Sequence, residues 1–382
     1  MKEKLHILHI PKWYPNPEDP QLGVFIQKQI KAASKFDRQC VLYIKSLESI
    51  DTKYTIEVKE NDGIREIFIF YKKPESRAKQ FILLTKLYEK GFKKINELEG
   101  KPDILHVHNM ISPAVWSYKY ARDNNIPWVL SEHWSGYTEQ TGYFASKMMW
   151  ERKLWQWYSE KAQCTIAVSE FLKSALIKSG IGRKHHIIPN VVEAINEKSE
   201  RNDTEVRILN VSDMVDDIKN ISGLLLAFSK LVVKNPEARL YLVGGGKDLT
   251  KLKKKADKLG ISSKVTFFGR LKNEDVLRMY NEIDFVLINS RVETFSVVAA
   301  EALLAGKPVL TTKCGGVEEF ISQEQGMLIK VDEQSSLEEA LQKMLINYKN
   351  YDAESLKRYA KEKFSSDAIG SSLHDIYHSI IT

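Results

Sequence analysis

The chain has 382 residues, of which 43% are hydrophobic and 28% charged, a composition that indicates two globular domains and excludes a disordered protein. Its net charge of +7 is concentrated in residues 1–190, which carry 30 basic and 21 acidic residues against 27 and 29 in residues 191–382. This first half is expected to contact an anionic partner, unless the charge only keeps the surface soluble.

The first half alternates between strand and helix patterns, which predicts a doubly wound α/β domain. Strands are predicted over 5–10, 40–44, 66–71, 104–108, 128–131, 165–168 and 186–189. Helices are predicted over 23–36, 114–123, 144–162 and 170–178, the last one capped by Ser169. No apolar run reaches the ~20 residues of a membrane span, and the three cysteines lack disulfide or metal spacing, so we expect a reducing compartment.

Residues 193–205 are polar and charged, and this stretch is predicted to be a linker. A second alternation follows it. Strands are predicted over 206–211, 240–243, 265–268 and 285–288 and in the apolar run that follows Pro308. Helices are predicted over 222–233, 247–259, 274–281 and 336–345, with two more helices over 353–381. The chain therefore predicts a second α/β domain of the same class.

The segment 285–310 carries the most specific pattern. Glu293 falls in a loop that follows an apolar strand, where open α/β sheets bind ligands. Ser296 can cap the next helix, which carries Glu301. A loop carboxylate, an anion-binding helix start and a helix carboxylate could together hold a sugar, a diphosphate and a ribose. Two ordinary solvated glutamates are the alternative for such a pair taken alone.

The segment resembles the signature of glycosyltransferase family 4, a family of retaining enzymes with the GT-B fold. The resemblance rests on the E-x7-E pair, on the G-x-P-V turn at 306–309 and on the G-G turn at 315–316, and it extends from the first strand to about residue 330. It implies two Rossmann-like domains that face a central cleft. The N-terminal domain, 1–192 completed by 366–382, would bind the acceptor, and the C-terminal domain, 206–365, would bind the nucleotide sugar, with the final helix crossing back to the first domain.

The resemblance also implies roles for single residues. Glu301 would accept hydrogen bonds from the ribose hydroxyls, and Glu293 would hold hydroxyls of the donor sugar. His133, just past a strand end, corresponds to the family's active-site histidine, although a lone histidine is more often structural. Glu293 and His133 are thus the candidate catalytic residues. The candidate donor-binding residues are Gly23, Lys219, Arg270, Thr294, Phe295, Ser296, Val297 and Glu301.

One residue departs from the family pattern. Asp213 stands where the family usually has an arginine that clamps the diphosphate, and an aspartate there would repel the ligand. Arg270 or another basic group would have to compensate. His106 and His108 share one face of a strand and are interpreted as core residues or as residues that support the site, not as metal ligands.

The function expected from this resemblance is transfer of a hexose or N-acetylhexosamine from a UDP-sugar to a saccharide or polyprenyl-linked acceptor, in polysaccharide or glycolipid assembly. Front-face attack, with the leaving phosphate taking the acceptor proton, is the expected mechanism. The sequence contains no D-x-D triplet, so we expect no metal and no cofactor besides the nucleotide-sugar co-substrate.

The basic and aromatic stretches 72–94 and 143–158 indicate either helices packed on the sheet or a surface that contacts an anionic membrane. No nucleic-acid motif occurs, so no nucleic acid is expected as a partner. The expected location is the cytoplasm or the inner face of its membrane. Two alternatives stay open: a nucleotide-sugar epimerase of the same fold, and a non-catalytic nucleotide-sugar-binding subunit.

Overall fold

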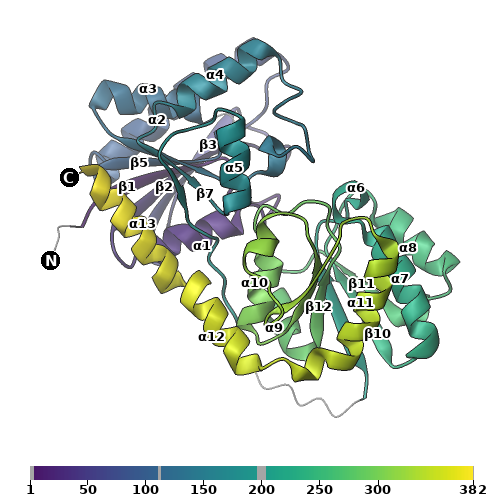
Figure 1. The fold of residues 1–382 in the computed structure, drawn as a ribbon. Coiled ribbons are helices and arrows are strands. Elements are labelled where there is room, and N and C mark those ends of the chain that lie inside the picture. Colours follow the sequence, from purple (N-terminus) through teal and green to yellow (C-terminus); the bar gives the residue numbers. More distant parts are fainter. Residues whose placement is uncertain (1–3, 111–112, 196–203, 382) are drawn as a thin grey trace. The chain divides into compact units, whose positions relative to one another are not determined.

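The computed structural model describes residues 4–110, 113–195 and 204–381, which form two compact units. Unit 1 consists of Met1–Val191 and Ser366–Thr382, and unit 2 of Val192–Ser365. Each unit is built around its own β-sheet with helices on both faces (Figure 1). The predicted fold class, two doubly wound α/β domains, is confirmed. Most of the predicted linker falls on 196–203, outside the described residues.

The sheet of unit 1 has eight strands in the order β3-β4-β2-β1-β5-β6-β7-β8. The strands are β1 (His6–Pro11), β2 (Arg38–Ser46), β3 (Tyr54–Asn61), β4 (Ile64–Tyr71), β5 (Ile104–His108), β6 (Trp128–Glu132), β7 (Cys164–Ala167) and β8 (His185–Ile187). β3 pairs antiparallel with β4, and the other neighbouring strands pair parallel. The chain extends the sheet to one side of β1 first and then, from β5, to the other side. The strand order therefore switches between β1 and β5.

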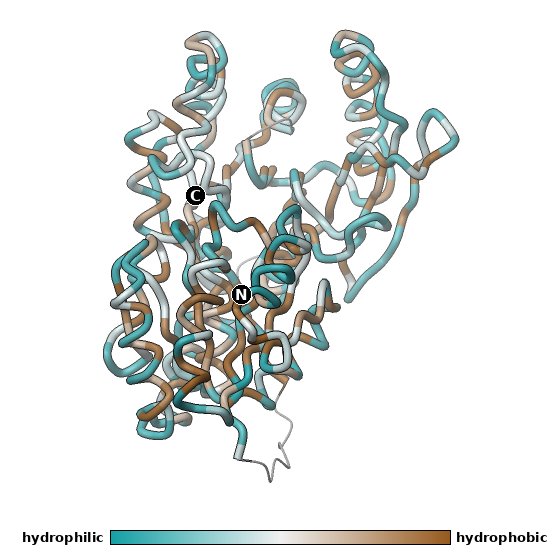
Figure 2. Tube along the Cα trace, turned by 90° about the vertical axis from the view of Figure 1, so that its right-hand side faces the viewer, coloured by the Kyte–Doolittle hydropathy of each residue, from teal (hydrophilic) through white to brown (hydrophobic). Residues whose placement is uncertain are grey.

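Helices cover both faces of this sheet. The helices of unit 1 are α1 (Val24–Ala33), α2 (Arg77–Glu99), α3 (Ala114–Asn124), η1 (Ser135–Tyr137), α4 (Met149–Ser159), α5 (Glu170–Lys178) and α13 (Ser366–Ile381). α2, α3 and α4 lie on one side of the sheet, and α1 and α13 on the other (Figure 1). Hydrophobic and hydrophilic residues alternate along the helices (Figure 2), as expected for helices that bury one face.

Unit 2 contains a parallel six-stranded sheet in the order β11-β10-β9-β12-β13-β14. The strands are β9 (Val206–Val211), β10 (Ala238–Val243), β11 (Val265–Gly269), β12 (Phe285–Ile288), β13 (Val309–Thr312) and β14 (Gly326–Ile329). The helices are α6 (Asp216–Lys219), α7 (Ile221–Lys234), α8 (Leu249–Lys258), η2 (Ser262–Lys264), α9 (Asn273–Glu282), α10 (Val297–Leu304), η3 (Gly316–Glu319), α11 (Gln334–Asn347), η4 (Tyr348–Asn350) and α12 (Ala353–Phe364). The strand order switches between β9 and β12, and ligands of such sheets bind outside the carboxyl ends of the strands at a switch.

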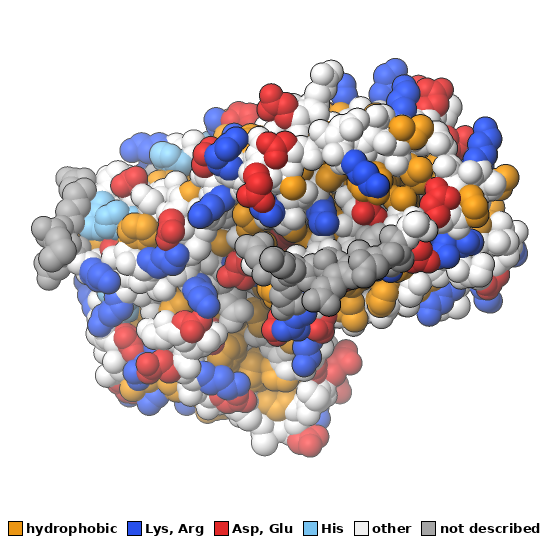
Figure 3. All heavy atoms as spheres, turned by 90° about the horizontal axis from the view of Figure 1, so that it is seen from below, with side chains coloured by type: hydrophobic (Ala, Val, Ile, Leu, Met, Phe, Trp, Pro, Cys, Tyr) orange, Lys and Arg blue, Asp and Glu red, His pale blue; other side chains and the backbone are white. Residues whose placement is uncertain are grey.

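Two surface properties complete the description. Among the described residues, no helix is both long and apolar enough to cross a membrane. Lys and Arg side chains are interspersed with Asp and Glu side chains over the face drawn in Figure 3. The described atoms of that face therefore do not form a patch of a single charge sign.

Candidate functional site

Two side chains of opposite charge meet at the switch of strand order in unit 2. Lys219 ends α6, which follows β9, and Glu293 lies in the loop after β12. The Nζ of Lys219 is 2.6 Å from Oε1 of Glu293, and the two side chains are 20% and 15% exposed. Ser290 Oγ donates a hydrogen bond to the same Oε1 at 2.7 Å. The structure thus brings together two predicted site residues that are 74 positions apart in the sequence.

The backbone around Glu293 is fixed from both sides. Its N–H donates to the carbonyl oxygen of Cys314 at 2.8 Å, and its own carbonyl oxygen accepts from Gly316 N at 2.8 Å. The G-G turn that follows β13 therefore positions the loop that carries Glu293. This contact gives a physical reason for the second glycine turn of the sequence signature.

The electrostatics of the pair favour the charged form of the lysine. Burial lowers the pKa of Lys219, but the neighbouring Glu293 carboxylate outweighs this effect and the net pKa is raised. Lys219 therefore stays protonated at neutral pH. A cation and a carboxylate then lie side by side at the sheet edge, an arrangement that can bind a phosphate together with a sugar.

The start of α10 lies next in the chain. Ser296 has φ 75°, a left-handed conformation that is strained for a residue other than glycine, and its Oγ accepts a hydrogen bond from Ala299 N at 3.4 Å. The predicted cap is confirmed. The first amides of an α-helix, here around Val297, have no partners within the helix and can bind an anion.

The side chain of Phe295 points into the core, so only the backbone of this residue is available to a ligand. Its side chain is 3% exposed and packs with Phe320 and Phe364, at ring-centroid distances of 5.1 and 5.3 Å. The ring thus anchors the start of α10 in the core. Thr294, the preceding residue, lies in the same short loop between Glu293 and the helix.

Glu301 lies one turn into α10 and is 3% exposed. Tyr280 OH, on α9, donates a hydrogen bond to its Oε2 at 3.2 Å. Burial, together with the Glu301 charge, raises the pKa of Tyr280 well above its ordinary value, so the phenol keeps its proton and remains a donor. Sequence reasoning missed Tyr280, because its contact with Glu301 depends on the packing of two helices and leaves no local pattern.

The residue that departed from the family pattern has a basic partner. Asp213 follows β9, and its Oδ1 lies 3.6 Å from Nη2 of Arg270, which follows β11. Both side chains are more than half exposed, so the pair contributes little to stability. It places a positive charge beside Asp213, and Arg270 was one of the basic groups considered for that position.

The two candidates of unit 1 lie at the carboxyl edge of its own sheet. Gly23 precedes α1 with φ 70°, and a Cβ there would lie 2.3 Å from the carbonyl oxygen of Trp13, so only glycine fits. His133 follows β6, and its ring centroid is 5.0 Å from that of Phe25 at the start of α1. The backbone N–H of His133 donates a hydrogen bond to Asn109 Oδ1 at 3.1 Å. Gly23 and His133 thus flank the same helix start.

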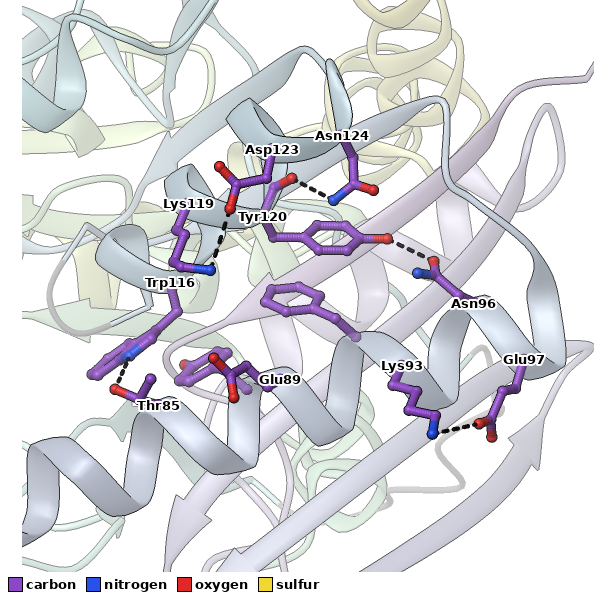
Figure 4. A pocket seen from close by; sticks show the side chains of 12 residues that line it. Thr85, Glu89, Lys93, Asn96, Glu97, Trp116, Lys119, Tyr120, Asp123 and Asn124 are labelled. Atoms are coloured by element: carbon purple, nitrogen blue, oxygen red, sulfur yellow. Dashed lines mark hydrogen bonds and ion pairs between the residues drawn. The ribbon is translucent and has the colours of Figure 1, made fainter.

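A separate groove of about 450 Å³ lies between α2 and α3 (Figure 4), and neither Gly23 nor His133 lines it. Its floor consists of two ring stacks, Tyr88 on Trp116 at 4.7 Å and Phe92 on Tyr120 at 4.0 Å. All four rings are at most 9% exposed, and ion-paired side chains line the rims. We interpret the stacked rings on the floor of this groove as the surface through which α3 packs on α2.

Family models match most of the chain. The model described as glycosyltransferase family 4 matches residues 51–194, and the model described as glycosyl transferases group 1 matches residues 191–363. The second match contains Lys219, Glu293 and Glu301, and the first contains His133.

Curated relatives and solved structures agree with these matches. An uncharacterized glycosyltransferase of Methanocaldococcus jannaschii is 29% identical over 162 residues, which are 42% of this chain and 41% of that protein. A D-inositol 3-phosphate glycosyltransferase of Corynebacterium jeikeium is 30% identical over 174 residues, 43% of this chain and 41% of that protein. The matches thus span less than half the length of these two relatives. The solved structure of Anabaena HepE in complex with UDP and glucose aligns with this chain at a TM-score of 0.75 and 19% sequence identity. The alignment covers 98% of this chain and 100% of the HepE chain, which shows a shared fold.

Proposed function

Since this chain belongs to glycosyltransferase family 4 and has the GT-B fold, we propose that it transfers a hexose or N-acetylhexosamine from a UDP-sugar to a saccharide or lipid-linked acceptor, with retention of configuration. The observation that carries the proposal is the Lys219–Glu293 pair at the switch of strand order in unit 2. A protonated amine suits the diphosphate of a nucleotide sugar, and a carboxylate beside it suits sugar hydroxyls. Support for UDP comes from Anabaena HepE, whose structure was solved in complex with UDP and glucose.

Stabilisation of the leaving group is the main chemical task in this proposal. The nucleoside diphosphate gains negative charge as the bond to the sugar breaks, and fixed positive groups near that charge lower the barrier. Lys219 and the amides at the start of α10 are assigned this role, and Gly23 is assigned to the approach of backbone to the phosphates. Arg270 keeps Asp213 from repelling the ligand. These groups would stabilise the diphosphate without a metal ion, which agrees with the lack of a D-x-D triplet.

The remaining assignments concern the sugar and the ribose. Glu301 is assigned to the ribose hydroxyls, with Tyr280 holding its carboxylate, and Glu293 to the hydroxyls of the transferred sugar. His133 is assigned to the same sugar from unit 1. For the transfer itself, the acceptor oxygen would attack on the face that the phosphate leaves, and the phosphate oxygen would take the acceptor proton. This step forms the new glycosidic bond as the sugar–phosphate bond breaks.

The acceptor side is assigned to unit 1, with a membrane contact. Five large apolar residues at the starts of α2 and α4 are 55–65% exposed: Phe81, Ile82, Met148, Met149 and Trp150. We call them the apolar cluster. Lys147 directly precedes Met148, and Arg77 lies in the first turn of α2, before Phe81. Exposed apolar side chains with basic neighbours suit an anionic membrane surface. The location proposed with this contact is the cytoplasm at the inner face of the membrane.

The donor assignment is tested with a panel of UDP- and GDP-sugars, by thermal shift first and then by release of the nucleoside diphosphate. We expect one UDP-sugar to stabilise the protein and to be turned over only when a saccharide or polyprenyl-linked acceptor is added. Conversion of the donor sugar without release of UDP would instead support the epimerase. Binding without turnover under any acceptor condition would support the non-catalytic subunit.

The membrane assignment has its own test. Flotation with vesicles that contain anionic lipid should recover the wild type and not the double variant Met149→Glu with Trp150→Glu. Val233→Glu is the control, because Val233 is an exposed apolar residue of unit 2 outside the cluster. Equal recovery of all three proteins would remove the membrane contact from the proposal and leave the donor assignment intact.

A further inference from the structure

A row of four polar side chains crosses the sheet of unit 1. Gln39, His9, His108 and His133 come from β2, β1, β5 and the end of β6, which are neighbours in the sheet in this order. The strand register places each of them two residues nearer the carboxyl edge than the one before. Because side chains two residues apart in a strand share a face, all four lie on the same face. The row therefore runs diagonally from the sheet interior to the candidate site.

Consecutive members of the row are in hydrogen-bonding contact. Gln39 Oε1 lies 2.6 Å from His9 Nε2, and His9 Nδ1 lies 2.9 Å from His108 Nε2. His108 Nδ1 lies 3.5 Å from His133 Nε2, which is the longest of the three contacts. All four residues are at most 7% exposed. The contacts are thus shielded from water along their whole length.

The amide of Gln39 sets the direction of the row. Its Nε2 donates to the carbonyl oxygen of Asp37 at 3.0 Å, so its Oε1 must be the atom that faces His9. The opposite amide orientation would place two oxygens against each other. An oxygen can only accept, and His9 therefore carries its proton on Nε2.

Because the imidazoles of the row are neutral, the tautomer of each histidine determines the tautomer of the next one. Burial lowers the pKa of His9 to about 4, opposed by the bond to Gln39, and burial also lowers the pKa of His108 well below its ordinary value. A neutral imidazole has one N–H and one acceptor nitrogen. His9 Nδ1 must then accept from His108 Nε2, and His108 Nδ1 must accept from His133 Nε2. Burial likewise lowers the pKa of His133, to about 3, opposed by a hydrogen bond with Asn190.

We propose that Gln39, His9 and His108 are positioning residues that hold His133 in the Nε2–H tautomer. The tautomer of a histidine is set by the hydrogen-bond partners of its ring nitrogens, and here the partner of Nε2 is itself fixed by the contacts from Gln39 to His108. The part of this inference that concerns substrate rests on the proposed function: His133 is assigned to the donor sugar, so a change of its tautomer would exchange the donor and acceptor nitrogens of its ring and lower kcat.

A metal site formed by His9, His106 and His108 is the competing explanation of the same imidazoles, because their ring nitrogens lie close enough to share an ion. His106 Nδ1 contacts Tyr377 OH at 2.7 Å, and its Nε2 contacts Ser131 Oγ at 2.6 Å. With the contacts of the row, all six ring nitrogens of the three histidines have a protein partner. The hydrogen-bonded row therefore accounts for them better than a metal does.

The test reads the tautomer directly by ¹⁵N NMR of the histidine rings in the full chain, without substrate. Wild-type His133 should show a protonated Nε2 and an unprotonated Nδ1. His108→Asn places an amide oxygen near the former Nδ1 and should keep this form. His108→Gln lacks an acceptor at that position and should give a mixture of tautomers. Gln39→Met removes the amide oxygen at the other end of the row, three contacts from His133, and should also give a mixture of His133 tautomers.

A matched control separates positioning from packing. His106→Asn disturbs an equally buried imidazole whose ring stacks on His108 at 4.2 Å but which is not part of the row. It should lower the thermal midpoint as the row variants do and leave the tautomer of His133 unchanged. With an active donor, kcat should fall about tenfold in His108→Gln and stay within about twofold in His108→Asn.

Two results would overturn the inference: a wild-type His133 protonated on Nδ1, or a His133 that keeps the Nε2–H form in both His108→Gln and Gln39→Met. If His108→Gln does not fold, Gln39→Met carries the test alone. Because the NMR readout needs no substrate, failure to find a donor would count against the proposed function and not against the row.

Discussion

The Nζ of Lys219 lies 2.6 Å from Oε1 of Glu293, across the point where the strand order of unit 2 switches between β9 and β12. The two residues are 74 positions apart in the sequence, and the pairing of β9 with β12 brings them together. The pair places a cation that stays charged next to the first carboxylate of the E-x7-E motif. The second carboxylate, Glu301, is held separately by Tyr280.

Replacement of the two carboxylates should separate their roles. Glu301→Ala should raise the KM for the donor, because a ribose contact made in both the ground state and the transition state is lost. Glu293→Ala should mainly lower kcat, because its contact to the transferred sugar matters most as the bond breaks. Steady-state kinetics with varied donor concentration distinguish the two. Equal, small changes in both variants would contradict the assignment.

The Tyr280 contact makes a further kinetic prediction. Tyr280→Phe removes the hydroxyl that donates to Glu301 and keeps the ring. One hydrogen bond to a charged group contributes about 1.5–3 kcal/mol. Because this bond is present before the donor binds, only part of that free energy is lost from binding, and the donor KM should rise by up to about tenfold with little change in kcat. A wild-type KM in Tyr280→Phe would mean that Glu301 does not need this partner to bind ribose.

The buried Glu132 should make stability depend on pH. Burial raises its pKa to about 7, although hydrogen bonds from Met110 N and Tyr137 OH act in the opposite direction. In the unfolded chain the carboxyl loses its proton near its ordinary pKa of 4.5. Its contribution to stability is therefore fully present below pH 4.5, declines between 4.5 and 7, and is lost above 7.

Glu132→Gln should remove this part of the pH dependence. The difference in unfolding free energy between the wild type and the variant should shift by about 3 kcal/mol in favour of the variant from pH 4.5 to pH 8. Urea unfolding at both pH values measures it, and taking the difference cancels the other titrating groups. A difference that does not change with pH would show that Glu132 ionises normally in the fold.

Gly23 offers a test of the loop that precedes α1. Gly23→Ala combines a positive φ with a Cβ 2.3 Å from the Trp13 carbonyl oxygen, whereas Gly63→Ala has a similar φ of 76° and no atom within 4 Å. The left-handed conformation alone costs about 1–2 kcal/mol. Gly63→Ala should lose about this amount, measured by urea unfolding, and Gly23→Ala should lose more, together with donor binding. Equal losses would mean that the loop relaxes around the added methyl group.

The sequence predicted most of the α/β alternation, because buried strands such as Phe285–Ile288 are continuous apolar runs. It missed two strands. β3 is an edge strand whose residues are mostly exposed, so its apolar pattern is weak. β14 has four residues and begins at Gly326, where a Cβ would lie 1.8 Å from the Val309 carbonyl oxygen, and a short strand that starts with glycine resembles a turn.

The candidate site was predictable only where its residues are close in sequence. The E-x7-E pair and the Ser296 cap lie in one segment, and both were found there. The contacts of Glu301 with Tyr280 and of Asp213 with Arg270, and the row from Gln39 to His133, all depend on strand order and helix packing. A single sequence contains these residues but does not say which of them meet.

The most direct test of the proposed donor site compares UDP with uridine by calorimetric titration, on the wild type and on Lys219→Met. Only UDP carries the diphosphate that Lys219 is assigned to bind. We predict that the variant binds UDP about tenfold more weakly or worse, consistent with the loss of one charge-assisted contact, and binds uridine as the wild type does. Equal affinity of the two proteins for UDP, or no binding of UDP by the wild type, would contradict the account.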